Sequence, residues 1–444
     1  MILLLVVLLV STAVHSPAQT SLLRSGPMIG HVDMQEARIW LQTTEPATVQ
    51  ITYRRQDGSG TTYSTAPMQT TWETACTATL VADSVRPGTT YTYTVAVNGE
   101  PCPLPHATAF RTQPIWKWRS DDYPTASLMI GSCFYVNEDG YERHRNGVES
   151  GYGSEFEILD AMTRTPTDAM LWLGDNVYLR EPDWNSRSGI LRRYAHTRAY
   201  TGLQPFLASR AHYAIWDDHD YGPNNSNTTF WGKHHALEAH RLFWPNPSVG
   251  MPEFAGITTT FELLDMQVFL LDDRWYRTPE HVTGEHKILG DAQLDWLVGA
   301  LASSTATFKI IAVGSQVLST DTRKEGFVHA PQERDRLIAA ITKNEISGVI
   351  FVSGDIHAAE LSRLDRPGTY PLYEFTSSAL TAGSNTGIAN QPNERRVEGT
   401  AYGEHNYGTL SVSGKRKQRV LTCTLYDRRG NVIWTRAINE QDLR

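Results

Sequence analysis

The fold is indicated most strongly by the stretch Met170-Leu171-Trp172-Leu173-Gly174-Asp175-Asn176-Val177-Tyr178. A short apolar run ends here at a glycine and a carboxylate, which is typical of a strand that is buried on both faces and leads into a loop. Three other segments have the same form, namely Met129-Ile130-Gly131-Ser132-Cys133, Tyr213-Ala214-Ile215-Trp216-Asp217-Asp218-His219-Asp220 and Val349-Ile350-Phe351-Val352-Ser353-Gly354-Asp355-Ile356-His357. Because ligands bind at the carboxyl ends of the strands in α/β sheets, we expect these distant segments to meet in one pocket.

An apolar block at the N-terminus, Met1 to Val10, is followed by small and polar residues. This pattern resembles a secretory signal peptide over residues 1–18, cleaved near Ala18. An uncleaved membrane anchor is the alternative, but the block falls short of the roughly 20 apolar residues that a spanning helix needs. No later segment of the sequence is long or apolar enough to cross a membrane. We therefore expect a secreted or periplasmic protein without a stable membrane span after cleavage.

Two domains are expected after the signal peptide, because the remaining length exceeds that of one ordinary domain. Residues 21–114 are rich in Thr, Tyr and Val in short alternating runs, which predicts a small β-sandwich of immunoglobulin or fibronectin III type. Residues 125–444 alternate apolar runs with helical patterns, and this order predicts an α/β domain. The expected helices are 156–162, 189–200, 291–301 and 333–342, and the expected closing hairpin pairs 420–426 with 432–435.

The formal net charge of -8 gives no support for a nucleic-acid-binding surface. Any anionic substrate must therefore be bound locally by cations. The four cysteines are too few for a disulfide scaffold. In an exported chain we nevertheless expect Cys76 and Cys102 to pair within the N-terminal domain, and we expect the protein to be a monomer.

The carboxylate of Asp175 emerges where a buried strand meets a loop. Its two oxygens can bridge two cations, as a binuclear hydrolase requires, although an aspartate at this place can also cap a turn. Tyr178 follows in the same loop and either faces the same side or packs in the core. Asp355 and His357 flank one residue, so in an extended chain both point to one face and form a half-site; a single core histidine is the alternative.

The sequence Asp217-Asp218-His219-Asp220 concentrates titratable groups directly after a strand. Adjacent carboxylates repel each other unless a cation or hydrogen bonds offset the charge, and the apolar residues before them argue against the alternative of a solvated acidic loop. Asn224 can supply an amide oxygen to a hard cation such as calcium. Cys133 is either a ligand or, as free cysteines more often are, a small buried apolar residue.

Taken together, the four motifs resemble, in their order and spacing, the alkaline phosphatase D family of calcineurin-like metallophosphatases. The resemblance is carried by Gly131-Ser132-Cys133, Gly174-Asp175-Asn176-Val177-Tyr178, Trp216-Asp217-Asp218-His219-Asp220 and Ser353-Gly354-Asp355-Ile356-His357. Further similarity lies in Leu271-Asp272-Asp273-Arg274-Trp275-Tyr276-Arg277, in Leu289-Gly290-Asp291-Ala292-Gln293-Leu294-Asp295-Trp296-Leu297 and in Thr376-Ser377-Ser378-Ala379-Leu380-Thr381. It extends from Ser127 to the C-terminus, and an N-terminal sandwich is usual for the family.

The resemblance implies a four-layer α/β/β/α metallophosphatase core and phosphomonoesterase or phosphodiesterase activity. Related enzymes open with Asp-x-His and continue with Gly-Asp-x-x-Asp, whereas this chain has Cys133 and Tyr178 at two of those places. Family members with that replacement resemble iron(III) enzymes with accompanying calcium. By motif position, the candidate iron ligands are Cys133, Asp175, Tyr178 and Asp218, and the candidate calcium ligands are Asp175, Asp355 and Asn224, with His357 beside them. The choice of Asp218 over Asp217 rests on alignment of Asp218-His219-Asp220 with the Asn-His-Asp signature of the wider superfamily.

The implied reaction is attack of a metal-activated water or hydroxide on phosphorus. His219 is the candidate for hydrogen bonding to the phosphoryl group or for protonating the leaving alkoxide. Arg274 is the candidate for binding the anion, since a guanidinium fork fits phosphate oxygens. The alternative for Arg274 is a salt bridge to Asp272 or Asp273.

Two other functions are compatible with parts of the sequence. One is a non-catalytic, secreted protein that binds a surface or a glycan, with the α/β domain as a degenerate relative. The other is a di-metal hydrolase similar to purple acid phosphatases, although Asp355 stands where that family has the first histidine of its closing motif. The substrate stays open among small-molecule and polymeric phosphate esters: monoesters, diesters, phospholipids and teichoic acid-like polymers.

Overall fold

A computed structural model of the chain describes residues 22–119, 122–138 and 152–444. The signal peptide expected over residues 1–18 lies outside these residues, as does most of the loop between Glu138 and Gly153. Within the described ranges, no helix combines the length and the apolar character that crossing a membrane requires.

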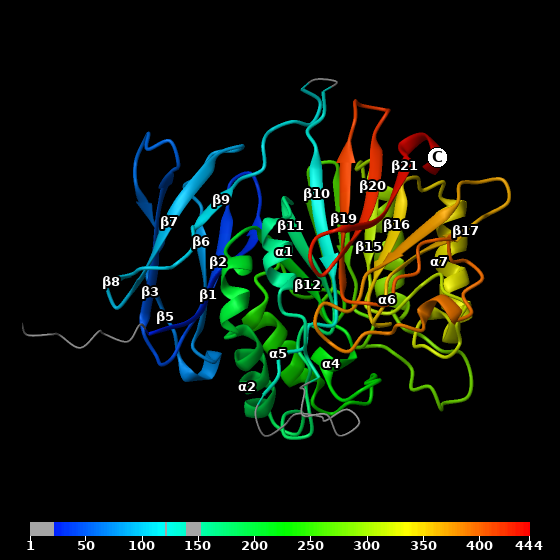
Figure 1. Cartoon of the computed structure of the whole chain (residues 1–444), viewed down its shortest axis with the longest axis horizontal. Helices are drawn as coiled ribbons and strands as arrows, with labels where there is room; N and C mark the ends of the chain where they lie inside the picture. Colours follow the sequence, from blue (N-terminus) through cyan, green and yellow to red (C-terminus); the bar gives the residue numbers. More distant parts are fainter. Residues whose placement is uncertain (1–21, 120–121, 139–151) are drawn as a thin grey trace, which may run out of the picture.

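The N-terminal part consists of two antiparallel sheets, drawn in blue and cyan in Figure 1. Alternate residues of β7 point inward, where Tyr91 and Tyr93 pack with Tyr53 and Phe110 in an aromatic core. This burial pattern confirms the all-β interpretation of the alternating runs. The first sheet has the order β1 (Leu23–Val32), β2 (Ala37–Thr43), β6 (Thr77–Ala82). The second contains β3 (Thr48–Arg55), β4 (Tyr63–Ser64), β5 (Met68–Gln69), β7 (Thr90–Val97), β8 (Glu100–Cys102) and β9 (Ala109–Arg111).

The expected disulfide between Cys76 and Cys102 is wrong, because Cys76 is a free cysteine. Cys76 is buried directly before β6 in the first sheet, whereas Cys102 ends β8 in the second sheet. Packed sheets lie about 10 Å apart, and the Cα atoms of a disulfide lie within about 7 Å of each other. The two thiols therefore belong to different layers, which their spacing in the sequence did not reveal.

The remaining chain forms two six-stranded mixed sheets. The first has the order β12 (Ala211–Ile215), β11 (Ala169–Leu173), β10 (Ala126–Gly131), β19 (Asn406–Ser413), β20 (Val420–Asp427), β21 (Val432–Asn439). The second has the order β13 (Thr259–Leu263), β14 (Met266–Leu270), β15 (Phe308–Ala312), β16 (Val349–Ser353), β18 (Leu372–Thr376), β17 (Glu360–Leu364). The α-helices are α1 (Ile158–Arg164), α2 (Arg187–Arg198), α3 (Gln204–Leu207), α4 (Asp218–Tyr221), α5 (Lys233–Phe243), α6 (Asp291–Ser303) and α7 (Pro331–Lys343).

The two sheets face each other and the helices cover their outer faces (Figure 1). Phe375 of β18 packs on Trp434 of β21 with ring centroids 4.9 Å apart, and a Cβ at Gly408 of β19 would lie 2.6 Å from the Phe375 ring. On the outer side of the first sheet, Met129 and Trp172 share a core with residues of α1, α2 and α5. This arrangement confirms the α/β/β/α sandwich. The expected helices and the closing hairpin are also present, with ends that differ by a few residues.

The first N-terminal sheet packs against the end of α5. Trp40 donates from its indole nitrogen to the carbonyl oxygen of Leu242, 2.7 Å away, at the end of α5. Arg38 donates to the carbonyl oxygens of Asn246 and Pro247 at 2.7 and 2.8 Å. These hydrogen bonds join β2 to the segment that follows α5, on the side of the molecule away from α6 and α7 (Figure 1).

Candidate metal centre

Four strands deliver the candidate ligands to one edge of the double sheet. In the first sheet, β10, β11 and β12 run parallel, so Cys133, Asp175 and Asp218 emerge side by side after their carboxyl ends. In the second sheet, β16 delivers Asp355 and His357. The two edges touch, because a Cβ at Gly354 would lie 2.4 Å from Oγ of Ser132. Glycine is therefore needed for the close approach of the two ligand-bearing turns.

The backbone turns sharply at most of these ligands. Four of them have positive φ angles: 58° at Cys133, 53° at Asp175, 67° at Asp355 and 56° at His357. Residues other than glycine avoid this left-handed region, at a cost of order 1–3 kcal/mol each, and such residues cluster at functional sites. The turns direct ligand side chains into a common space immediately after each strand.

Within the described ranges, the ligand atoms fall into three groups in which all atoms lie within 4.8 Å of one another. Asp175 belongs to two of them, one with Cys133 and His357 and one with Asp218 and His219. The third group joins Asp217, Asp218 and Asp355, and so connects the two sheets. Sγ of Cys133 lies 3.6 Å from Oδ2 of Asp175. Asp175 thus lies where one carboxylate can contact two cations, and so does Asp218, which also belongs to two of the groups.

The remaining candidate ligands surround this centre. The hydroxyl of Tyr178 lies 3.2 Å from Nε2 of His357, and the Tyr178 ring lies 4.4 Å, centroid to centroid, from that of His219. The backbone N–H of Asn225 donates to Oδ2 of Asp218 at 2.6 Å, and the neighbouring Asn224 lines the same pocket. Cys133 and Tyr178 are buried behind the pocket wall, at 0% and 2% exposure.

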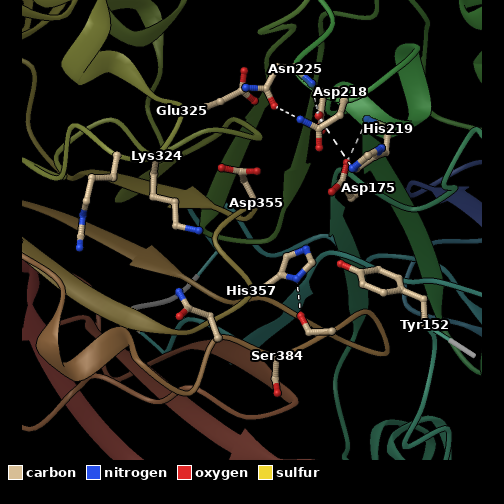
Figure 2. A pocket seen from close by; sticks show the side chains of 14 residues that line it. Tyr152, Asp175, Asp218, His219, Asn225, Lys324, Glu325, Asp355, His357 and Ser384 are labelled. Carbon is tan, nitrogen blue, oxygen red and sulfur yellow. Dashed lines mark hydrogen bonds and ion pairs between the residues drawn. The ribbon is translucent and has the colours of Figure 1, made fainter. Parts of the chain in front are cut away.

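The centre opens into a pocket of about 680 Å³, whose walls are shown in Figure 2. Asp175, Asp218 and His219 lie together on one side, and Asp355 and His357 face them. The lining residues are Tyr152, Asp175, Asp218, His219, Asn224, Asn225, Arg323, Lys324, Glu325, Asp355, His357, Gly383, Ser384 and Asn385. A cavity of this size, with acidic groups at its floor, has room for a small ester or the end of a polymer.

The electrostatics of the floor call for a cation. Burial, followed by the negative charges of Asp218, Asp220 and Asp355, raises the pKa of Asp175 well above its usual range. Burial, followed by Glu325 and Asp218, raises the pKa of Asp355 to about 7. Oδ1 of Asp218 is buried without a hydrogen-bond partner among the residues that the structure describes. Metal ions would remove these penalties, and the carboxylate, imidazole, phenol and thiol donors fit metal ligation.

Arg274 is placed differently from the sequence-based expectation that it binds the substrate anion. Its side chain is fully buried, does not line the pocket, and donates from Nε to Oδ1 of Asp217 at 2.6 Å. A second nitrogen donates to Oε2 of Glu325 at 2.7 Å. The guanidinium is therefore occupied in neutralising carboxylates. Of the expected alternative partners, Asp273 does form an ion pair with Nε of Arg274, at 3.7 Å, whereas Asp272 accepts a hydrogen bond from the backbone N–H of Arg274 and not from its guanidinium.

The ion pair with Arg274 also distinguishes the two adjacent aspartates. One oxygen of Asp217 is held by Arg274, and Asp217 does not line the pocket, whereas Asp218 does. The third carboxylate of this segment, Asp220, accepts hydrogen bonds from the backbone N–H groups of Asp217, Asn176 and Val177. Asp220 thereby connects the turn after β12 to the turn after β11, which fixes the positions of Asp218 and Asp175 relative to each other.

Several residues of the site were missed by sequence reasoning. Ser378 donates to Sγ of Cys133 at 3.0 Å, and Nδ1 of His357 donates to the carbonyl oxygen of Gly383. Ser378 belongs to a motif already noted for its family resemblance, which was the available signal. Lys324 and Glu325 lie in a loop without strand or helix periodicity, and nothing in the sequence connected them with the centre.

Comparisons with known proteins agree with this geometry. Residues 145–417 match the family described as PhoD-like phosphatase, and residues 20–115 match a domain of unknown function, DUF7800. Alkaline phosphatase D of Bacillus subtilis (strain 168) is 22% identical over 339 residues, which cover 63% of this chain and 55% of the relative. The chain therefore spans about half the length of that curated relative.

Two solved structures share the fold. A structure of PhoD superposes with a TM-score of 0.75 at 17% identity and covers 95% of this chain and 93% of its own. A purple acid phosphatase from yellow lupin (Lupinus luteus) gives a TM-score of 0.66 at 12% identity, with 93% and 74% covered. Since the family match extends over more than half of the sequence, the chain belongs to the PhoD-like phosphatase family.

Proposed function

We propose that this protein is a metal-dependent phosphoric ester hydrolase of the alkaline phosphatase D type, which acts on phosphate monoesters or diesters. One observation carries the proposal: Asp175, Asp218, Asp355 and His357, which are distant in the sequence, line a single pocket, and Cys133 lies buried directly behind Asp175. These carboxylates are crowded together, and a buried oxygen of Asp218 has no hydrogen-bond partner among the described residues, so cations are needed to offset the charge.

The proposed metal ions are iron(III) and calcium. Cys133, Asp175, Tyr178 and Asp218 are the proposed iron ligands, because thiolate and phenolate donors suit a trivalent ion. Asp175, Asp355 and Asn224 are the proposed calcium ligands, with His357 beside them, because hard oxygen donors suit calcium. When bound, the metal ions would polarise the phosphoryl oxygens and lower the pKa of the attacking water.

His219 is the proposed proton donor to the leaving alkoxide. Its ring lies against Tyr178 and lines the pocket, and its Nδ1 atom makes no hydrogen bond with any described residue. The backbone N–H of His219 donates to Oδ1 of Asp175 at 3.2 Å, which fixes the residue next to the centre. Burial lowers the pKa of His219, so a proton on this imidazole is readily released to a leaving alkoxide in the pocket.

The test is hydrolysis of p-nitrophenyl phosphate and bis(p-nitrophenyl) phosphate, with elemental analysis of the same purified samples. Asp175→Ala should lower kcat/KM by at least about 100-fold and reduce bound metal, because a shared metal ligand supports several kcal/mol of transition-state stabilisation. Asp295→Ala, at an exposed position of α6, is the matched control and should stay within about twofold. Activity of Asp175→Ala within about tenfold of wild type would remove Asp175 from the bridging role.

We also propose that the protein acts outside the cytoplasm, after removal of a signal peptide. The support is the apolar N-terminal block and the small residues that follow it. N-terminal sequencing of the mature protein from cell fractions should give a start near Gln19.

The alternative function is that of a non-catalytic binding protein. It would be favoured if the purified protein retained no metal and hydrolysed neither ester.

A further inference from the structure

The pocket is acidic at its floor, but one side of its rim is basic. Among the residues that the structure describes, two lysine or arginine side chains line it, Arg323 and Lys324. Both belong to the loop that connects β15 to α7, on the second sheet. Figure 2 shows Lys324 reaching into the pocket from the side opposite Tyr152, with its amino group directed toward the space below Asp355.

Of the two cations, Arg323 is already neutralised. Its guanidinium forms two hydrogen bonds of 2.8 Å to the carboxylate of Asp321, and its side chain is 55% exposed. An exposed arginine that is paired in this way contributes little to the attraction of an anion. Arg323 therefore serves as the reference for Lys324, because it is its neighbour in the chain and carries the same charge.

The segment that carries Lys324 is held at the Lys324 carbonyl group and at the next residue. The carbonyl oxygen of Lys324 accepts a hydrogen bond of 3.0 Å from Nε2 of His329. The next residue, Glu325, is held by Arg274 at 2.7 Å and by Arg277 at 3.3 Å. The lysine thus projects from a rigid segment, and the flexible part is confined to its four-carbon side chain.

The ammonium group of Lys324 has no hydrogen bond and no ion pair with any residue in the described parts of the chain. Lys324 lines the same pocket as Asp355 and His357, and its amino group points into the space beside them. Lys324 is therefore near both proposed ligands and still free to bind an anion.

We propose that Lys324 binds a non-bridging oxygen of the phosphoryl group and thereby favours doubly charged phosphate monoesters over singly charged diesters. The inference rests on the proposed function and deepens it by naming the substrate class. With Asp355 neutralised by metal, Lys324 is an uncompensated positive charge at the wall of the pocket. Its attraction to a ligand grows in proportion to the ligand's charge, so a dianion gains about twice as much as a monoanion. Lys324 takes the role that the sequence had suggested for Arg274.

The direct test is calorimetric titration of the metal-loaded full-length protein with inorganic phosphate at pH 8. Lys324→Met should raise the Kd of phosphate about tenfold, whereas Arg323→Met should change it less than about twofold. Lys324→Arg should restore most of the affinity, because it keeps the charge. With esters of the same leaving group, Lys324→Met should raise KM about tenfold for p-nitrophenyl phosphate and about threefold for bis(p-nitrophenyl) phosphate, with kcat little changed.

Three outcomes would overturn this role of Lys324: an unchanged Kd for phosphate in Lys324→Met, an equal loss in Arg323→Met, or equal effects on the two esters. Loss of metal from Lys324→Met would also overturn it, because weaker phosphate binding would then follow from damage to the metal centre and not from loss of the lysine charge. A wild-type protein that hydrolyses neither ester contradicts the proposed function instead, and in that case the phosphate titrations still decide whether Lys324 binds the anion.

Discussion

Replacing Arg274 by methionine should destabilise the protein strongly, and the structure indicates by how much. The side chain has 0% exposure and pairs with Asp217, also at 0%, and with Glu325 at 8%. Removing one partner of a buried ion pair typically costs about 3–5 kcal/mol, because the other charge is left without compensation. Methionine keeps most of the apolar volume, so the expected loss is mainly electrostatic.

The surroundings of Asp217 place the cost at the upper end of this range. A Cβ at Gly174 would lie 2.5 Å from Cβ of Asp217, and one at Gly314 would lie 2.6 Å from its Cγ. Asp217 is thus enclosed between two glycines and cannot turn toward water. Glu325 is different, because it lines the pocket and can be hydrated there. We therefore expect a loss of about 4–5 kcal/mol, most of it from Asp217.

The assay is urea unfolding followed by tryptophan fluorescence, with steady-state kinetics on the same samples. Arg363→Met is the control, because Arg363 is 47% exposed and pairs with an exposed Asp365; it should change stability by less than about 1 kcal/mol. A loss below about 1 kcal/mol in Arg274→Met, together with a large rise in KM for phosphate esters, would refute the reasoning. That result would mean that Arg274 contacts the substrate rather than the carboxylates.

Two further predictions concern the core around the site. Gly314→Ala should lower the free energy of unfolding by about 1–3 kcal/mol, because the added methyl group would overlap Asp217. Gly299→Ala, which has open space around it on α6, should raise the free energy of unfolding by about 0.5–1 kcal/mol. Equal urea midpoints for the two variants would contradict this. His212 accepts from the Trp172 indole at 3.0 Å, and burial lowers its pKa to about 3. Neutral His212 stabilises the fold fully above its unfolded-state pKa of about 6.5, and this stabilisation is lost as pH falls toward 3. Between pH 7 and 5, the free energy of unfolding of His212→Gln should therefore fall by about 2 kcal/mol less than that of wild type. Equal decreases in the two proteins would contradict this.

The strands and their ligands could be predicted because the signal was local. An apolar run followed by a polar ligand identifies both a buried strand and its carboxyl end, and Asp175, Asp218 and Asp355 all follow that pattern. The helices α6 and α7 were equally visible, since their apolar positions recur with helical spacing. What each residue contributes within its own segment was therefore readable from the sequence.

Contacts between side chains from distant segments could not be predicted from the sequence. Arg274 was expected to bind the substrate anion or, alternatively, to pair with Asp272 or Asp273. It does pair with Asp273 at 3.7 Å, but folding also brings the closer carboxylates of Asp217 and Glu325 to its guanidinium. Lys324 lies in an irregular loop, where no periodicity marks a direction for the side chain. Such contacts depend on how the two sheets are stacked, which one sequence does not specify.

Donors from opposite layers meet at the centre, since Cys133 and Asp175 follow strands of the first sheet and Asp355 and His357 follow β16 of the second. An ion bound by donors from both sheets therefore links the two layers to each other. Its binding energy then adds to the resistance to unfolding, by about 1.4 kcal/mol for each tenfold excess of free ion over Kd. The free energy of unfolding of this protein would consequently depend on the ionic composition of the solution as much as on the apolar core.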